Sequence, residues 1–193
     1  MIASLRNRID DGSFERDLLG GVGVVCLSKN ALNIPMWSHY ADFHRGLVLE
    51  FRIPIMGKRE DVQFATDRLL PHPVIYTPDR PHIRIGTEHP KELVEKVALT
   101  KSIDWRYEEE ERVIDHVRGP GIYQYRRDDI LCSVIAGLKM SDDNYRYLKT
   151  LVGEVSQRSI PRLLLFKALE RGGEYRLEVE GHPRLSEKGV GVI

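Results

Sequence analysis

The order of strand-like and helical segments is the feature of this sequence that most restricts its fold. Residues 46–53 alternate with a period of two, which predicts a strand, and the nearly all-apolar residues 131–137 predict a central strand. Helical patterns at about residues 34–43, 90–102 and 141–153 do not alternate with the strands as repeated βαβ units require. We therefore expect an α+β fold with a few helices and a mostly antiparallel or mixed sheet.

The end of the chain gives the clearest local prediction. Two strand-like segments within residues 162–180 flank Gly172 and Gly173, and Leu177 and Val179 alternate with polar neighbours. This pattern predicts a C-terminal β-hairpin. Because 193 residues is about the length of one domain, we expect residues 1–193 to form a single domain.

The remaining segments carry weaker signals. Residues 2–19 have loosely helical spacing and predict a short broken helix. Residues 21–27 predict a buried strand, and residues 123–125 a further strand. Residues 54–88 are rich in Pro, His and Arg and predict a loop, interrupted by a short strand at 74–76.

Charge and hydropathy exclude several classes of protein. The 29 Lys and Arg residues balance the 29 Asp and Glu residues, so no overall field attracts nucleic acid or an anionic membrane. The longest run of apolar and glycine residues, Leu18–Leu27, is shorter than the ~18 residues of a membrane span. The first residues are charged where a secretory signal would be apolar. We expect a cytoplasmic protein that binds neither membranes nor nucleic acid in general.

The sequence also lacks the signals of a cysteine-built site and of a nucleotide-binding loop. The two cysteines, Cys26 and Cys132, lie in apolar strand-like runs, which predicts buried, reduced thiols rather than a disulfide framework or a zinc site. Neither common glycine-rich phosphate loop occurs, so P-loop and Rossmann nucleotide binding lose their main signature.

Residues 37–44 form the first candidate cluster, with two histidines and three aromatic residues. We expect a cap at Asn30 or Asn33 and a helix that reaches Phe43. Its broad inward face would consist of Met36, Trp37, Tyr40, Ala41 and His44, with His39 and Phe43 at the edge of that face. Such a face can stack on a flat ring and offer titratable donors. The alternative is a core helix whose histidines bond backbone carbonyls. The five-residue histidine spacing does not fit a helical metal pair, and we expect no metal.

Residues 105–112 form the second cluster, with four consecutive glutamates between aromatic and arginine residues. If this segment is extended, Glu108, Glu110 and Arg112 share one face, with Cα atoms two residues apart separated by about 6.5 Å. Carboxylates at this spacing can act on one substrate, and the arginine keeps at least one ionised. If it is helical, Glu108 and Arg112 form only a surface pair. The alternative reading is a solvated charged face.

These motifs, W-S-H-Y-A at residues 37–41 and W-x-Y-E-x-E-x-R at 105–112, resemble a bacterial family known as domain of unknown function 2971. The resemblance spans residues 25 to about 137. Members usually begin with a further segment that carries a Tyr- or His-bearing strand and an Asn-Asp-Pro-Phe-like motif, and this chain starts after it. The chain is therefore expected to be a fragment or start-site variant, or to have an incomplete site.

The Glu-x-Glu motif is also similar to the acidic motif of ADP-ribosyltransferases, and this resemblance implies an ADP-ribosyltransferase-like fold. This resemblance implies that Glu110 stabilises an oxocarbenium-like transition state at the nicotinamide ribose of NAD, while Glu108 orients the acceptor. The residues that would line the NAD site are Trp37, His39, Tyr40, His44, Tyr107 and Arg112.

Three hypotheses of function remain open. The first is an NAD-dependent ADP-ribosyltransferase-like enzyme of a toxin or phage-defence system, with an unknown acceptor. It requires both clusters to share one cleft. The second is a non-catalytic module that binds a ligand or a protein and in which the acidic strand is structural. The third is a nuclease with His39 or His44 as base and Glu108 or Glu110 at a metal, which the neutral charge disfavours.

Overall fold

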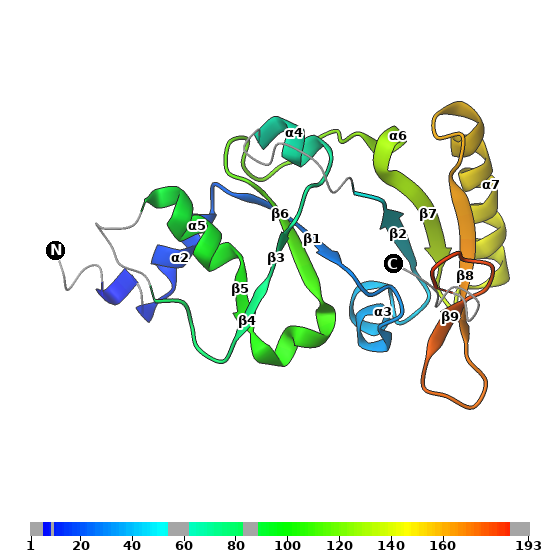
Figure 1. Cartoon of the computed structure of the whole chain (residues 1–193), viewed down its shortest axis with the longest axis horizontal. Coiled ribbons are helices and arrows are strands. Elements are labelled where there is room, and N and C mark those ends of the chain that lie inside the picture. Colours follow the sequence, from blue (N-terminus) through cyan, green and yellow to red (C-terminus); the bar gives the residue numbers. More distant parts are fainter. Residues whose placement is uncertain (1–5, 9, 54–61, 83–88, 186–193) are drawn as a thin grey trace. The chain divides into compact units, whose positions relative to one another are not determined.

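The computed structural model describes residues 6–8, 10–53, 62–82 and 89–185 (Figure 1). The chain divides into two compact units, and each unit is assembled from two separate segments. Unit 1 comprises Met1–Lys29 and Ile55–Tyr125, and unit 2 comprises Asn30–Pro54 and Arg126–Ile193. Helices occur together with antiparallel and mixed sheets, which confirms the α+β fold class.

Unit 1 contains two small sheets and short helices. Its elements are α2 (Ser13–Leu19), β1 (Gly23–Ser28), α4 (Val62–Asp67), β3 (His72–Pro73), β4 (Ile75–Thr77), α5 (Pro90–Ala98), β5 (Thr100–Ser102), the 3-10 helix η1 (Ile103–Glu108) and β6 (Glu110–Asp115). Strand β6 lies between β1 and β3 and is antiparallel to both, whereas β4 and β5 form a parallel pair. A small core joins Val94 and Ala98 of α5 to Ile114 of β6.

Several sequence predictions for unit 1 are wrong in detail. Strand β1 was expected to be buried, but it is an edge strand with only β6 beside it, and Val24 and Val25 are exposed. Cys26 is exposed for the same reason. The helix expected over 90–102 ends at Ala98, because residues 100–102 pair with β4 instead.

The loops of unit 1 also differ from the expectation. The segment predicted as a loop with one strand contains α4 in addition to β3 and β4. Residues 123–125 form no strand. Tyr123 instead donates its hydroxyl to the Arg118 carbonyl at 2.8 Å, and the Arg118 guanidinium lies over its ring. An aromatic side chain thus finds local partners here without a neighbouring strand.

Unit 2 is built on one four-stranded mixed sheet. Its elements are α3 (Ile34–Tyr40), β2 (Leu47–Phe51), α6 (Arg127–Ile130), β7 (Leu131–Ala136), α7 (Asp142–Arg158), β8 (Leu164–Glu170) and β9 (Leu177–Val179). The strand order is β2-β7-β8-β9, with β7 and β8 parallel and joined through α7. Strands β8 and β9 are antiparallel, which confirms the C-terminal hairpin, and β7 is internal as predicted.

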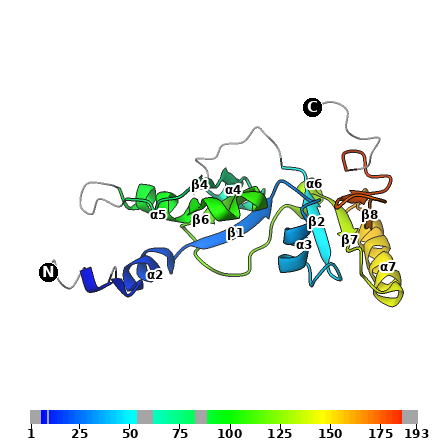
Figure 2. The ribbon, with the colours of Figure 1, turned by 90° about the horizontal axis from the view of Figure 1, so that it is seen from below.

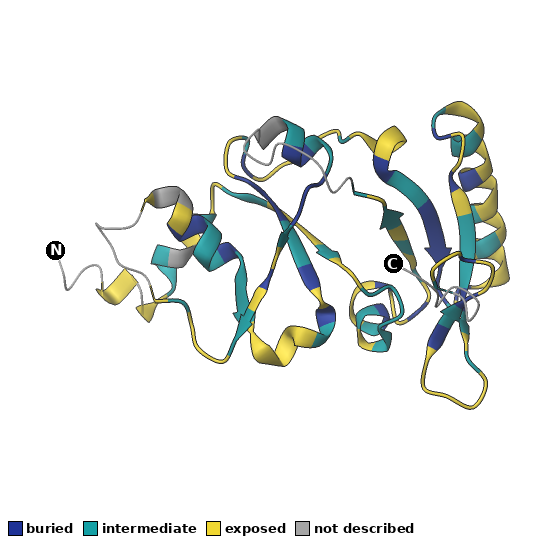
Figure 3. Cartoon of the chain, in the orientation of Figure 1, coloured by how far each residue is buried: buried dark blue, intermediate teal, exposed yellow. Residues whose placement is uncertain are grey.

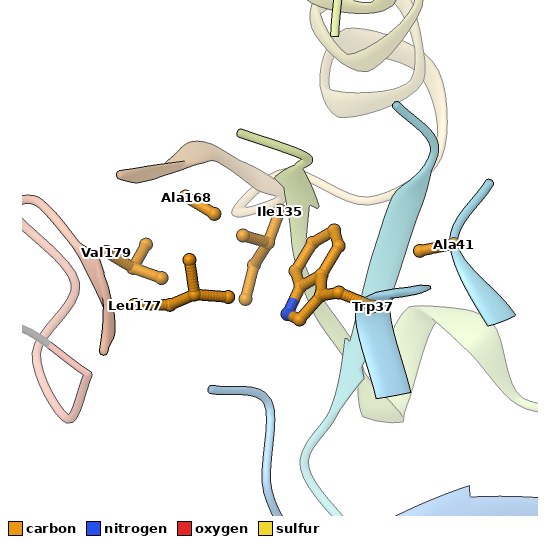
Figure 4. Close-up of a cluster of buried hydrophobic side chains, with 6 residues drawn as sticks. All are labelled: Trp37, Ala41, Ile135, Ala168, Leu177 and Val179. Carbon is orange, nitrogen blue, oxygen red and sulfur yellow. The ribbon is translucent and has the colours of Figure 1, made fainter. Parts of the chain in front are cut away.

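The sheet of unit 2 is packed on both faces. One face carries Trp37, Ala41, Ile135, Ala168, Leu177 and Val179, with the Trp37 ring against Ile135 (Figure 4). On the other face Val134 contacts Val152 of α7, whose outer surface is exposed (Figure 3). Figure 2 shows α7 lying along β8. Successive residues of β7 alternate between the two cores, as a central strand requires.

Helix α7 begins where the sequence predicts and ends later. The Ser141 hydroxyl accepts a hydrogen bond from the Asn144 amide at 3.3 Å, so Ser141 is the expected cap. The helix continues to Arg158 rather than ending near Gly153. Val152 is buried on the inner side of this helix, whereas Leu151 beside it is exposed. None of the described helices has the length and apolar character of a membrane span.

Candidate functional site

The segment at residues 37–44, here called the aromatic turn, begins on helix α3. Asn33 caps this helix by accepting a hydrogen bond from the Met36 amide at 3.1 Å, and Pro35 lies in the first turn. Trp37 is 2% exposed and donates its indole N–H to the Ala31 carbonyl at 2.7 Å. This tryptophan is therefore part of the core of unit 2.

The aromatic turn leaves the helix at Tyr40 and becomes left-handed. Asp42, Phe43 and His44 have φ angles of 45°, 50° and 70°, a conformation that costs L-residues roughly 1–2 kcal/mol each. Hydrogen bonds hold it: the His44 amide donates to the Trp37 carbonyl at 3.2 Å, and the Lys139 amide donates to the His44 carbonyl at 2.9 Å. Three consecutive residues in this region require the surrounding structure to impose the conformation.

The left-handed turn changes which side chains face inward. His44 is buried and stacks on Trp37 with 6.3 Å between the ring centroids. Tyr40 is 66% exposed, so its expected place on the inward face is wrong, and His39, expected at the edge of that face, is also exposed. Ser38, which is not among the residues of the expected inward face, has its hydroxyl 3.0 Å from His44 Nε2. The helical wheel assumed a helix that reaches Phe43, whereas α3 ends at Tyr40 and Trp37 is its buried residue.

Burial also sets the protonation of His44. Loss of hydration lowers the pKa of His44, and the positive charge of Lys139 lowers it further. Its Nδ1 atom has no hydrogen-bond partner within the part of the chain that the structure describes. His44 is thus a neutral, packed imidazole.

The second predicted site forms a buried ion cluster of Lys101, Glu108, Glu110 and Arg112, here called the acidic cluster. Glu108 ends η1, Glu109 has a left-handed φ of 46°, and Glu110 begins β6. The segment is therefore neither the continuous strand nor the α-helix that the sequence left open. The kink nevertheless brings both carboxylates to one cation, because Lys101 Nζ contacts Glu108 Oε2 and lies 2.9 Å from Glu110 Oε2.

Arg112 completes the acidic cluster. Its Nε and Nη2 atoms donate to Glu110 Oε1 and Oε2 at 2.8 and 3.0 Å, and its Nη1 donates to the Ala98 carbonyl. The side chains of Glu108 and Glu110 are 2% and 5% exposed. The alternative of a solvated charged face is therefore wrong for these two glutamates, although Glu109 between them is exposed.

The charges of the acidic cluster determine its protonation states. Burial favours the neutral acid, but hydrogen bonds from Arg112, Cys26 and Lys101 outweigh it and lower the pKa of Glu110 to about 2. Cys26 is exposed as a residue, but desolvation of its thiol and the hydrogen bond and charge of the neighbouring Glu110 raise the pKa of Cys26 to about 11. At neutral pH the cluster thus holds a permanent carboxylate beside a neutral thiol.

The hydrogen bonds to Glu110 restrict its chemistry. A carboxylate offers about four acceptor sites. Arg112 supplies two donors and Lys101 supplies one, so these two cations occupy three of the sites. In this arrangement Glu110 joins β6 to its neighbours and has few acceptor sites left for a substrate.

The eight predicted site residues fall into two groups. Glu108, Glu110 and Arg112 lie together in unit 1, with the Tyr107 ring 5.9 Å from that of Trp105 nearby. Trp37, His39, Tyr40 and His44 lie in the aromatic turn of unit 2. No group of three or more His, Cys, Asp or Glu side chains in the described ranges is arranged to hold a metal.

Sequence reasoning missed a second buried polar cluster, around Glu50 of β2. Ser133 Oγ and His182 Nε2 lie 2.5 and 3.0 Å from Glu50 Oε2, and Arg184 contacts Oε1. Burial favours the neutral acid, but these hydrogen bonds keep the pKa of Glu50 below its ordinary value. Residues two apart on a strand face the same side of the sheet, so Glu50 lies on the same face of β2 as Val48. Val48 packs on the Trp37 core, and this spacing was the signal that the sequence offered.

Sequence reasoning also missed a pocket in unit 2 of about 460 Å³, here called the arginine pocket. One side comes from residues 30–35, at the start of α3, and the other from residues 171–185, around the hairpin turn and β9. Its charged lining includes Arg171, Arg176 and Arg184. The two arginines beside the Gly-Gly turn were a signal, but only folding brings them near α3.

Comparison with known proteins identifies one segment. Residues 36–113 match the family model described as "Protein of unknown function (DUF2971)". No curated protein and no solved structure matches the chain. The matched segment contains both the aromatic turn and the acidic cluster, which are the motifs that carried the resemblance. Over residues 36–113 this chain is therefore similar to the DUF2971 family of proteins of unknown function.

Proposed function

We propose that this protein is a ligand-binding module and that the arginine pocket of unit 2 takes a small, negatively charged molecule. The observation that carries the proposal is the lining of the pocket, where three arginines outnumber one acidic residue, Glu178, and meet apolar side chains such as Pro35, Leu177 and Leu185. Arginine matches carboxylate and phosphate groups through paired donors.

The size and composition of the arginine pocket support this proposal. Pockets that hold small ligands typically measure about 300–1,000 Å³ and combine an apolar wall with a few polar groups. The pocket, at about 460 Å³, falls within this range. The acidic cluster supports the same conclusion, since its carboxylates are buried and paired and so contribute to structure rather than to binding.

Binding of AMP at low ionic strength tests the proposal. We expect AMP to raise the melting temperature and to bind saturably in calorimetry, whereas adenosine, which lacks the charge, binds far less. Arg176→Gln should weaken AMP binding about tenfold, since a hydrogen bond to a charged group is lost. Arg162→Gln, at an exposed position outside the pocket, is the matched control. No saturable binding of AMP, ADP-ribose or NAD, or equal AMP binding by both variants, contradicts the proposal.

A second candidate is the NAD-dependent ADP-ribosyltransferase-like activity implied by the Glu-x-Glu resemblance. The observation in its favour is that Glu110 remains ionised at any physiological pH, as stabilisation of a ribosyl cation requires. Catalysis would require Arg112 or Lys101 to release Glu110 when NAD binds, and Glu108 would then face the acceptor.

Release of nicotinamide from NAD tests this second candidate. We expect turnover by the wild type and its loss in Glu110→Gln, with circular dichroism confirming that the variant is folded at the assay temperature. Glu109→Gln, which changes the exposed neighbouring carboxylate, should retain activity. Absence of nicotinamide release by the wild type rejects the transferase hypothesis and leaves the binding proposal intact.

A further inference from the structure

Glu174 already places an anionic group between two arginines of the pocket. Its Oε1 lies 3.3 Å from Arg171 Nε and its Oε2 lies 3.6 Å from Arg176 Nη1. The hairpin turn fixes this arrangement, because the Arg171 amide donates to the Arg176 carbonyl at 3.0 Å and the Glu174 amide donates to the Arg171 carbonyl at 3.1 Å. One carboxylate thus bridges two guanidinium groups that line the pocket.

The contacts of Glu174 are weak enough to be exchanged. The Arg176 and Glu174 side chains are 70% and 43% exposed, and water screens such pairs strongly. A carboxylate carries one negative charge and two oxygens. A phosphate monoester carries nearly two charges and three strong acceptor oxygens, so it satisfies two arginines better than Glu174 does.

We propose that the ligand of the arginine pocket is a phosphate monoester and that its phosphate displaces Glu174 from Arg171 and Arg176. This inference rests on the proposed function. Glu174 then acts as a built-in competitor that keeps the two guanidinium groups together when the pocket is empty and lowers the affinity for external anions. The apolar lining and the exposed ring of Tyr175 remain for the body of the ligand.

The affinity of Glu174→Gln for AMP tests this inference. We expect binding about threefold to tenfold tighter than in the wild type, because two exposed ion pairs no longer compete. Glu154→Gln removes the same charge from an exposed position on α7 and should leave the affinity unchanged. Cyclic AMP, a diester with a single charge, should bind the wild type more weakly than AMP.

The outcomes separate this inference from the proposed function. If AMP binding depends on Arg176 but is equal in wild type and Glu174→Gln, the displacement is wrong and the anion pocket stands. Equal tightening by Glu154→Gln also rejects the displacement, since only net charge then matters. If neither the wild type nor Glu174→Gln binds AMP, the phosphate monoester is wrong, and the anion pocket fails with it when ADP-ribose and NAD also do not bind.

Discussion

Replacement of Glu110 by glutamine is expected to lower the free energy of unfolding by about 3 kcal/mol, because it breaks a buried ion cluster from its centre. The Glu110 side chain is 5% exposed and carries the contacts of both Arg112 and Lys101. A neutral amide cannot accept from all of these donors, and Arg112 loses its paired carboxylate. Urea unfolding followed by Trp105 fluorescence measures the loss, since Lys101 lies 5.2 Å from that ring.

The matched control is Glu109→Gln. Glu109 is the adjacent glutamate, but it is exposed, and an exposed substitution typically changes stability by less than about 0.5 kcal/mol. The wild type and Glu109→Gln share the left-handed backbone at residue 109, so its strain does not contribute to the difference in stability between them. If both substitutions cost the same, net charge determines stability and the buried contacts do not.

The pH dependence gives a second measurement of the same cluster. The pKa of Glu110 falls from an ordinary value of 4.5 to about 2 on folding. Its stabilising contribution is therefore complete above pH 4.5 and is lost as the pH falls from 4.5 towards 2. Between pH 7 and pH 3 the wild type should lose more stability than Glu110→Gln, so the two unfolding curves converge in acid. Parallel losses would show that Glu110 titrates normally.

The acidic cluster illustrates what the sequence could predict. The spacing of Glu108, Glu110 and Arg112 indicated that they would share one face if the segment were extended. In the structure they meet for another reason, because a 3-10 helix and a kink at Glu109 bring them together. Lys101 was not predicted as a member. It reaches the carboxylates only because β5 pairs with β4, a contact that depends on tertiary structure.

The aromatic turn shows what the sequence could not predict. Its sequence contains no glycine at residues 42–44, so local propensity gives no reason to expect three left-handed residues. The cap at Asn33 and the burial of Trp37 followed local rules and were predicted or implied. The end of the helix depends on β7 and the residues after it, nearly a hundred positions later in the chain. The arginine pocket and the two discontinuous units depend on contacts at similar separations.

Replacement of Gly137 by alanine is expected to destabilise unit 2 by about 3 kcal/mol. A Cβ atom there would lie 2.7 Å from the His44 carbonyl carbon and 2.9 Å from the Gly46 oxygen, and still closer to the His44 oxygen. These are backbone atoms of the segment that carries the aromatic turn, so the end of β7 must move away. That movement adds overpacking strain and weakens the hydrogen bonds Gly137 N–H to Gly46 O and Lys139 N–H to His44 O, both 2.9 Å.

Gly153→Ala supplies a control of opposite sign. Gly153 lies inside α7, and a Cβ atom there meets nothing within 4 Å. Alanine is more favourable than glycine in a helix interior by roughly 0.5–1 kcal/mol, so this variant should be more stable than the wild type. Urea unfolding followed by Trp37 fluorescence in a Trp105→Phe background compares both variants in unit 2. Should Gly137→Ala match the wild type, the close approach of β7 to the aromatic turn would be wrong, and with it the explanation for the left-handed conformation of His44.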